Sequence, residues 1–365
     1  MTLRITLDRD KPLAEQADKG HNRWHPDIEP VAELEPGGRV ELDTLDSTDG
    51  EIKPDSTIAE LDKIVPNAHP LTGPLRVNGA EPGDLLAIHI EEIHPQPFAW
   101  TRSRPGFGFL RERFLESHLT RWNIRDGFAT SSDLPGVRIP AAPFMGVMGV
   151  APSHDLHRAM LAREAELAAK GGVAFPPKPE GAVPAHLGAD ALRTVPPREN
   201  GGNVDIRHLV AGTTVYMPVF KEGALFSAGD AHFAQGDGEV CGTAIEMGAT
   251  FCARLEVIKG GAGDRRDMSF EWQGDGPPPG LNLPGRYYAT TGICVHRDGR
   301  NASEDVTLAA RNALLNMIDH LQRTYGYNDL QAYHLCSVAV NLKLSQVVDL
   351  PNVLVTALLP LDIFE

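Results

Sequence analysis

The alternation of apolar and polar residues along this chain predicts several half-buried β-strands. Apolar side chains occupy every second position over residues 39–43, 86–91 and, most regularly, 251–257. Because successive side chains of a strand point to opposite faces, this spacing is typical of a strand with one buried face. The turn sequences EPGG at 35–38 and EPGD at 81–84 separate such segments. We therefore expect antiparallel β structure in the first half and the centre of the chain.

A helical period is found mainly in two later segments. The first, DLHRAMLAREAELAAKGG, has a candidate N-cap in Ser153 or Asp155 and a stop at its final Gly pair. The second, SEDVTLAARNALLNMIDHLQRTYG, begins at a candidate cap, Ser303, has one apolar face and ends at Gly326. A shorter helix through DLQAYHLCSVAV and a strand through NVLVTALLP follow, which indicates an α+β C-terminal part.

These elements predict a mainly β fold with an α+β C-terminal part. The N-terminal and central sheets are expected to be sandwich-like or barrel-like, with helices mostly after residue 300. At 365 residues the chain is long enough for more than one packed unit. We expect a β-rich N-terminal domain over 1–150, a helix with a Pro/Gly-rich surface excursion over 151–202, and over 203–365 a β region that carries the catalytic motifs and the α+β portion.

Composition and charge limit the classes of partner. Asp and Glu outnumber Lys and Arg by 49 to 34, which gives a formal net charge of −15. This charge repels nucleic acid and anionic membranes, so neither is an expected partner. The N-terminal residues lack the apolar core of a signal peptide and the chain has no long apolar run, so we expect a soluble cytoplasmic protein. The four cysteines lack CxxC spacing and are expected to be reduced.

Residues 229–242, GDAHFAQGDGEVCG, concentrate side chains that can perform chemistry. Asp230 and His232 are two positions apart, as are Asp237 and Glu239. On extended backbone this spacing turns both members of a pair to the same side. An Asp-x-His pair supplies an oxygen and a nitrogen ligand, which suits zinc or a similar divalent cation.

A solvated hairpin turn is the competing interpretation of this stretch, because Asp-Gly is a common turn sequence. The flanking segments ALFSAG and VCGTAIEMGA are small and apolar, however. Such flanks indicate that the polar run is drawn into the protein body, where unpaired charge is costly. Gly236 and Gly238 allow the backbone to bend, so that Asp237 or Glu239 can face the same cavity.

Two further polar clusters are candidates for this cavity. Asn203 and Asp205 stand two apart after a Gly pair, although an Asx turn that opens a helix explains this spacing equally well. His69 precedes two turns that contain proline and is a candidate for a pocket rim, with an ordinary turn residue as the alternative. Cys241 lies near Glu239, which raises the alternative of a thiol nucleophile, but a buried and inert cysteine is the commoner state.

Four segments give the chain a resemblance to the acetamidase/formamidase family of amidohydrolases. They are GALFSAGDAHFAQGDGEVCGTAIEM, GGNVDIRHLVAGTTVYMPV, NAHPLTGPLRVNGAEPGDLLAIHI and GHNRWHPDIEPVAELEPGGRVELDTLDSTDGEI. The resemblance is most specific over residues 223–246. It implies hydrolysis of a short carboxamide, such as formamide or acetamide, to ammonia and carboxylate. It also implies a β-rich fold with an α+β C-terminal portion, often a bound divalent metal, and a homo-oligomer, either a dimer or a trimer.

Together these patterns predict a metal-assisted amidohydrolase. A bound cation would polarise the amide carbonyl and lower the pKa of water from about 16 towards about 7. Asp230 and His232 are the first-choice ligands, and Asp205 or His69 completes the set. Zinc is the expected ion, with calcium as the alternative.

Neighbouring polar residues are expected to transfer protons and bind the substrate. Glu239 is the expected general base, taking a proton from the attacking water and passing it to the departing ammonia. Asp237 and His232 complete the expected catalytic set, and the expected substrate-binding residues are Asn203, Gln235 and His69. The Pro-rich segment over 170–203 could reshape the pocket for a larger substrate. Two other classes stay open: a thiol amidase that uses Cys241, and a non-catalytic β-rich protein that binds a small polar ligand.

Overall fold

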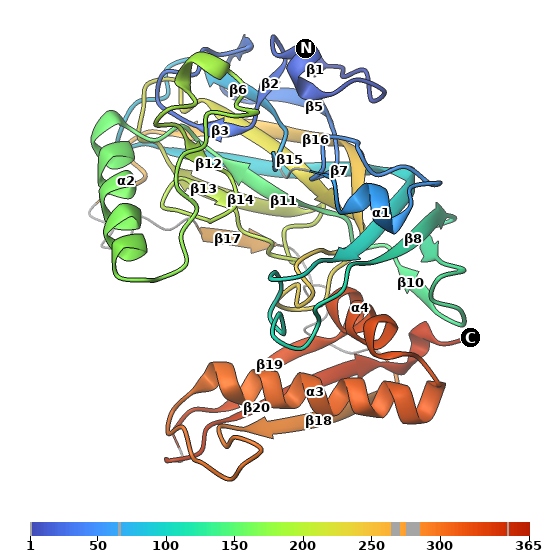
Figure 1. Cartoon of the computed structure of the whole chain (residues 1–365). Helices are drawn as coiled ribbons and strands as arrows, with labels where there is room; N and C mark the ends of the chain where they lie inside the picture. The colour runs from blue at the N-terminus through green and yellow to red at the C-terminus, as the bar shows by residue number, and fades with distance from the viewer. Residues whose placement is uncertain (1, 65–66, 264–270, 275–284, 349) are drawn as a thin grey trace.

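The computed structural model describes residues 2–64, 67–263, 271–274, 285–348 and 350–365. Within these residues a large sheet of fifteen strands forms the body, and a three-stranded sheet lies beside it at the C-terminal end (Figure 1). The strands of the large sheet are β1 (Thr2–Ile5), β2 (Gly20–His21), β4 (Ala32–Leu34), β5 (Gly38–Thr44), β6 (Leu71–Val77), β7 (Leu85–Ser103), β8 (His118–Arg125), β9 (Phe128–Thr130), β10 (Arg138–Pro140), β11 (Phe144–Gly149), β13 (Gly201–Asn203), β14 (Thr213–Pro218), β15 (Phe226–His232), β16 (Glu246–Ile258) and β17 (Glu271–Gly274).

The pairing within the large sheet is antiparallel, apart from the parallel pairs of β1 with β5 and β4 with β6 among the described strands. Its main path runs β10-β9-β8-β7-β16-β15-β11-β13. Strands on both sides of residue 150, where we expected a domain boundary, belong to this sheet, because β11 pairs with β15. The mainly β fold predicted from the sequence is confirmed.

The strands with the clearest alternation form the centre of the sheet. β16 pairs with β5 on one side and β7 on the other, which places Phe251 opposite both Leu42 and Ile93. Phe251, Leu255 and Leu42 are fully buried, whereas Arg254 on the other face of β16 is partly exposed. Burial of each such apolar side chain contributes about 1.5–3 kcal/mol, so this seam is a main part of the core.

The C-terminal part has the predicted α+β character. Strands β18 (Tyr287–Ile293), β20 (Leu354–Pro360) and β19 (Asn341–Gln346) form the small sheet in this order, and helix α3 (Val306–Tyr325) packs against it. Helix α4 (Asp329–Ala339) contacts both α3 and strands of the large sheet, and so joins the two parts (Figure 1).

Helix α3 begins two residues later than its sequence predicts. The Asp305 carboxylate accepts a hydrogen bond of 2.9 Å from the Leu308 backbone N–H, so Asp305 is the N-cap and the expectation for Ser303 is wrong. A carboxylate at this position also interacts favourably with the helix dipole. The predicted end at Gly326 is confirmed, because Gly326 caps the helix with a φ of 73°.

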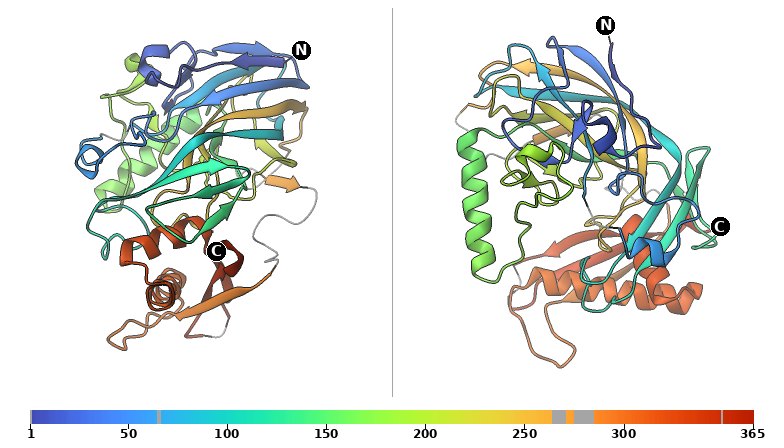
Figure 2. Two further views of the ribbon diagram at one scale, coloured as in Figure 1. Left: turned by 90° about the vertical axis from the view of Figure 1, so that its right-hand side faces the viewer. Right: turned by 45° about the horizontal axis from the view of Figure 1, so that its top comes forward.

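Helix α2 (His154–Ala169) is capped by Ser153, as predicted, and stands along one side of the large sheet (Figure 2). The chain then returns through a 3-10 turn, η2 (Ala185–Leu187), and through β12 (Leu192–Arg193), which pairs with β3 (Arg23–Trp24). Leu192 and Thr194 are fully buried. The segment over 170–203 is therefore only partly the surface excursion that its composition predicts.

Short helical elements complete the described chain: η1 (Leu13–Gln16), α1 (Ile58–Leu61) and η3 (Leu361–Ile363). None of the helices in the described ranges is long and apolar enough to cross a membrane.

Candidate active site

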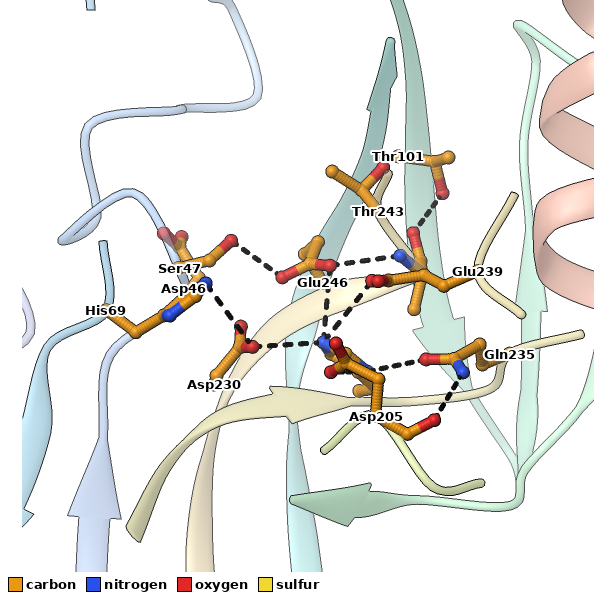
Figure 3. Close-up of polar contacts among 12 residues, drawn as sticks. Asp46, Ser47, His69, Thr101, Asp205, Asp230, Gln235, Glu239, Thr243 and Glu246 are labelled. Carbon is orange, nitrogen blue, oxygen red and sulfur yellow. Dashed lines mark hydrogen bonds and ion pairs between the residues drawn. The ribbon is translucent and has the colours of Figure 1, made fainter. Parts of the chain in front are cut away.

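Five side chains from β15, β16 and two loops meet at one end of these strands. Asp230 and His232 lie on β15, and Glu246 is the first residue of β16. Asp205 follows β13, and Glu239 lies in the loop between β15 and β16. Figure 3 shows the four carboxylates turned toward one common point. The stretch over 229–242 thus contributes Asp230, His232 and Glu239 to the cluster.

His232 is the centre of this cluster. Its Nε2 lies 3.3 Å from Glu246 Oε1, 3.4 Å from Asp230 Oδ2 and 3.9 Å from Glu239 Oε1. Its Nδ1 lies 4.0 Å from Asp205 Oδ1. One imidazole ring therefore faces four carboxylates, three of them through the same nitrogen.

Gln235 fixes the orientation of the His232 ring. The amide oxygen of Gln235 accepts a hydrogen bond of 3.0 Å from His232 Nδ1, and its Nε2 donates to the Asp205 carbonyl at 2.8 Å. The Phe144 ring packs edge-on against the imidazole at a centroid distance of 5.0 Å. Because an amide oxygen only accepts, Nδ1 carries a proton, and Nε2 is the nitrogen directed at the carboxylates.

Three of the four carboxylates stand on left-handed backbone. The φ angle is 46° at Asp205, 57° at Asp230 and 45° at Glu239. Residues other than glycine adopt this region at an energetic cost, and such strain is concentrated at functional sites. Asp230 therefore does not reach His232 through extended backbone, as its spacing predicts. A local turn of the strand at Asp230 brings the two side chains together.

Gly146 on β11 provides the space for this cluster. A Cβ atom at this position would lie 2.7 Å from Asp205 Oδ1, 2.8 Å from Asp230 Oδ2 and 2.8 Å from His232 Cε1. These distances are shorter than real contacts, so only glycine fits without a shift of the site.

Burial and the closeness of the charged groups to one another determine the protonation of the cluster. Burial raises the pKa of both Asp205 and Asp230 to about 7, and it raises the pKa of Glu239 well above its usual range. Burial alone would lower the pKa of His232, but the adjacent Glu246 and Asp230 carboxylates raise it well above 6.5. The carboxylates therefore compete for protons and for any positive charge within reach.

This donor set fits a divalent cation. Among the described residues no Lys or Arg pairs with the four carboxylates, whose ion-pair partners are His232 and, for Asp230, also His69 at 3.7 Å. The buried atoms Asp205 Oδ1, Asp230 Oδ1 and His232 Nε2 have no hydrogen-bond partner within the described chain. Uncompensated buried carboxylates are costly, and a set of carboxylate oxygens with an imidazole nitrogen suits zinc.

Two overlapping sets of donor atoms have the required proximity. Asp230, His232 and Glu246 form one set, and Asp205, His232 and Glu239 form the other, with donor atoms within 4.8 Å of one another. The first set is buried in all three members, whereas Asp205 and Glu239 are partly exposed.

A further group that could hold a metal, made of His25, His157 and Asp190, lies outside this cluster. The Asp190 side chain is 60% exposed, so water satisfies it without a cation.

The cluster opens into a cavity of about 390 Å³. Asn203 lines this cavity; its Nδ2 donates to the Val195 carbonyl at 3.1 Å, while its buried Oδ1 has no hydrogen-bond partner in the described chain. The predicted site residues in the cavity wall are His69, Asn203, Asp205, Asp230 and Glu239. An unsatisfied amide oxygen beside the acidic cluster is suited to accept a hydrogen bond from a ligand.

Three predicted site residues are not in the cavity wall. His232 is fully buried and lies against the wall residues Asp230, Glu239 and Glu246. Gln235 is buried and uses both ends of its amide on His232 and Asp205, which favours a positioning role over direct substrate contact. Asp237 forms an ion pair of 2.7 Å with Lys343 on β19 and so faces away from the cluster. Both pairs are two positions apart in the sequence. The side chains of Asp230 and His232 are in contact, whereas those of Asp237 and Glu239 point in different directions.

Glu246 is the member of the cluster that the sequence analysis missed. It accepts hydrogen bonds from Ser47 Oγ at 2.7 Å and from the Ala244 backbone N–H at 3.0 Å. Although burial opposes it, the adjacent His232 lowers the pKa of Glu246 to about 2, so this carboxylate is ionised. In the antiparallel pairing of β15 with β16, Glu246 is the direct partner of His232. If the pairing register of β15 and β16 were known from the sequence, it would identify Glu246 as a member of the cluster.

Cys241 is buried and is not part of the cavity wall. Its Sγ lies 3.5 Å from the Thr243 carbonyl oxygen and 3.9 Å from that of Arg102. Burial raises the pKa of this thiol, and carbonyl oxygens stabilise S–H rather than a thiolate. These contacts disfavour the thiol-nucleophile alternative.

Comparison with known proteins places this site in a wider context. A model of the Acetamidase/Formamidase family matches residues 6–365. An acetamidase of Mycolicibacterium smegmatis is 38% identical over 90% of this chain and 87% of its own length. A formamidase of Methylophilus methylotrophus is 35% identical over 99% of this chain and 93% of its own length. A solved structure, a gamma lactamase from Delftia acidovorans, superposes with a TM-score of 0.94 at 34% identity, covering all of this chain and 94% of that one.

Proposed function

Because the chain belongs to the acetamidase/formamidase family and is thus an amide hydrolase that acts on C–N bonds, we propose that the cluster around His232 is its active site. The proposed reaction adds water to the carbonyl carbon of a small carboxamide and releases ammonia and a carboxylate. The observation that carries this proposal is the convergence of four carboxylates, two buried and two partly exposed, on one buried imidazole beside a cavity. Such groups are arranged for chemistry rather than for stability.

We propose that Asp230, His232 and Glu246 hold a divalent cation, with zinc as the ion that suits their donor atoms. Bound there, the cation would polarise the substrate carbonyl and lower the pKa of the attacking water. Glu246 is held in place by Ser47 and by the Ala244 N–H, and His232 is oriented by Gln235. Ligands fixed by their own hydrogen bonds are typical of metal centres.

Glu239 is the proposed general base. Its carboxylate lines the cavity beside the other acidic groups, and its raised pKa makes it a stronger base than an exposed glutamate. It would accept a proton from the attacking water and return it to the departing nitrogen. Asn203 Oδ1 is placed to accept a hydrogen bond from the substrate NH₂ group, since it has no other partner within the described residues.

The first test of this proposal is ammonia release from formamide, acetamide and longer amides. Protein treated with a chelator is expected to lose activity and to regain it when zinc is added back. Full activity of verified metal-free protein would exclude a catalytic metal. Absence of hydrolysis for every amide in the presence of zinc would exclude the proposed reaction for this site.

Substitution separates the two carboxylates that the sequence analysis assigned to catalysis. Glu239→Gln is expected to lower kcat by about 10²- to 10⁴-fold, the usual contribution of proton transfer. Asp237→Asn, which breaks only the ion pair with Lys343, is expected to have the smaller effect. A larger loss in Asp237→Asn than in Glu239→Gln would contradict the assignment of the base.

The assembly of the protein stays a prediction that follows from the resemblance. A dimer or a trimer is expected, and a measurement of mass in solution distinguishes the two from a monomer.

A further inference from the structure

The wall of the cavity carries two guanidinium groups that have no acidic partner. Arg104 and Arg193 both line the cavity and are half-buried. Neither forms an ion pair or a side-chain hydrogen bond with any residue in the described part of the chain, although acidic residues outnumber basic ones. Other Arg residues of the described chain do pair with carboxylates, as Arg121 does with Asp133.

Each of these guanidinium groups is held by an aromatic ring of the same cavity. The Arg104 guanidinium lies 4.6 Å from the centre of the Phe107 ring, and that of Arg193 lies 5.4 Å from the centre of the Phe175 ring. Stacking fixes the plane of a guanidinium and leaves its N–H donors free at the edge. The ring contacts therefore restrain both groups at the cavity wall and leave their N–H donors available to a ligand.

The electrostatics of this wall favour an anion. Burial and the nearby charge of Arg193 lower the pKa of Arg104, and burial lowers that of Arg193, so each cation is less stable here than in water. Lys178 lines the same cavity and adds to the positive charge. The carboxylates of the His232 cluster do not pair with these cations, and they are committed to the proposed metal. An anion in the cavity would satisfy both guanidinium groups.

The size of the cavity also exceeds the needs of the smallest amides. Its volume of about 390 Å³ falls within the range of about 300–1,000 Å³ that is typical of pockets for ligands much larger than formamide or acetamide. Arg193 and Phe175 belong to the segment over 170–203, whose composition suggested that it could reshape the pocket for a larger substrate. These two residues line the cavity together with the His232 cluster's Asp205, Asp230, Glu239 and Glu246.

We propose that the substrates of this enzyme are amides that carry a carboxylate at the far end of a short carbon chain. Arg104 and Arg193 bind the carboxylate, Phe107 and Phe175 flank the carbon chain, and the amide group reaches the His232 cluster. This inference rests on the proposed amidase function. Arg102 has a different role, because its Nη2 donates to the Leu61 carbonyl at 2.7 Å and supports the cavity wall.

The test compares hydrolysis of succinamate with that of pentanamide, a neutral amide of similar length, by the zinc-loaded enzyme. The wild-type enzyme is expected to have the higher kcat/KM for succinamate. The double variant Arg104→Gln, Arg193→Gln is expected to reduce the ratio of the two kcat/KM values by about 10-fold or more, the usual effect of losing hydrogen bonds to a charged group. The change is expected mainly in KM, because the carboxylate is bound equally before and during the reaction.

Two further variants serve as controls. Arg138→Gln removes a guanidinium that stacks on Phe128 at 3.4 Å outside the cavity, and it is expected to leave the ratio unchanged. Arg193→Lys keeps the charge at the cavity wall and is expected to retain part of the preference for succinamate. Raised ionic strength is expected to reduce the ratio in the wild-type enzyme.

The results separate the failure of this inference from that of the proposed function. If the enzyme hydrolyses pentanamide and acetamide but the double variant has the same ratio as the wild type, the carboxylate site is wrong and the amidase function stands. If the wild type prefers pentanamide, the inference is also overturned. If the zinc-loaded enzyme hydrolyses none of these amides, the proposed function fails and this inference fails with it.

Discussion

At the scale of single residues, the cluster depends on the absence of a side chain at Gly146. Gly146→Ala would place a methyl group within 2.8 Å of Asp205, Asp230 and His232, so these groups must move. Displacement of catalytic groups by about 1 Å typically costs about 100-fold in rate. We therefore expect kcat/KM to fall by about 100-fold or more and zinc affinity to fall with it, as measured by amide hydrolysis and metal titration.

The control for this substitution is Gly274→Ala at the end of β17. Among the described residues, the nearest atom to a Cβ there would be Thr213 Oγ1, at an ordinary distance of 3.4 Å. This variant is expected to retain activity and stability. Equal activity of Gly146→Ala and Gly274→Ala would show that the cluster tolerates the methyl group and that its geometry is not critical.

The residues of the site could be predicted only as far as they lie close together in the sequence. Asp230, His232 and Glu239 come from one polar stretch with apolar flanks, and these features indicate burial. Glu246 was missed because its place depends on the register of two strands, which no local pattern specifies. Asp237 faces Lys343 rather than the cluster, because left-handed backbone at Glu239 breaks the alternation of the two residues.

At the scale of secondary-structure elements, buried His21 links β2 to β15 through a hydrogen bond to Ser227. Its Nδ1 donates to the Arg23 carbonyl, and its Nε2 accepts from Ser227 Oγ at 2.7 Å. Burial lowers the pKa of His21 from 6.5 to about 4. Between these values the unfolded chain binds one proton more than the folded protein, so this residue makes the free energy of unfolding decrease as the pH falls from 6.5 to 4.

His21→Gln tests this pH dependence. At about 1.4 kcal/mol for each pKa unit, the effect of His21 amounts to about 3 kcal/mol across this interval. Urea unfolding of wild type and variant between pH 4.5 and pH 7.5 is expected to show a shallower dependence on pH in the variant. The contributions of other titrating groups cancel in the difference between the two proteins. Parallel curves would contradict the role of His21.

The start of α3 provides a second test at this scale. Asp305→Ala removes the carboxylate that caps the Leu308 N–H and is expected to reduce the free energy of unfolding by about 1 kcal/mol. Ser303→Ala, at the position that the sequence suggested, is expected to have a smaller effect. Urea unfolding of both variants measures the difference, and a larger loss for Ser303→Ala would place the cap at Ser303 after all.

Elements with a regular hydrophobic period could be predicted from the sequence. Elements whose structure depends on contacts with distant parts of the chain could not. The alternating strands β5, β7 and β16 and the amphipathic helix α3 are found where the pattern places them, because each buries one regular face. The segment over 170–203 has no period, so its buried residues and its pairing with β3 could not be seen in the sequence. Its contact with the cavity depends on segments more than a hundred residues away.

At the scale of the whole molecule, the cavity of the candidate active site is assembled from distant parts of the chain. Ser47 lies in the turn after β5, Trp100 lies on β7, Arg193 comes from the segment before β13, and Glu246 lies at the start of β16. The fold class followed from the sequence because it depends on composition and local pattern. The charge distribution of the cavity did not, because it depends on which distant residues the sheet brings together.

The same assembly predicts that metal stabilises the entire fold. Without a cation, the four carboxylates of the cluster, of which Asp230 and Glu246 are buried, have only His69 and His232 as ion-pair partners among the described residues, so folding must bury unbalanced charge. Zinc at 100 times its dissociation constant would add about 2.7 kcal/mol to the free energy of unfolding, which for a chain of this size raises Tm by several degrees. Chelation is expected to lower Tm and zinc to restore it, whereas Asp230→Asn is expected to lose most of this response. The metal content must be shown to change on chelation. An equal Tm with and without chelator would then contradict the prediction that bound metal stabilises the fold.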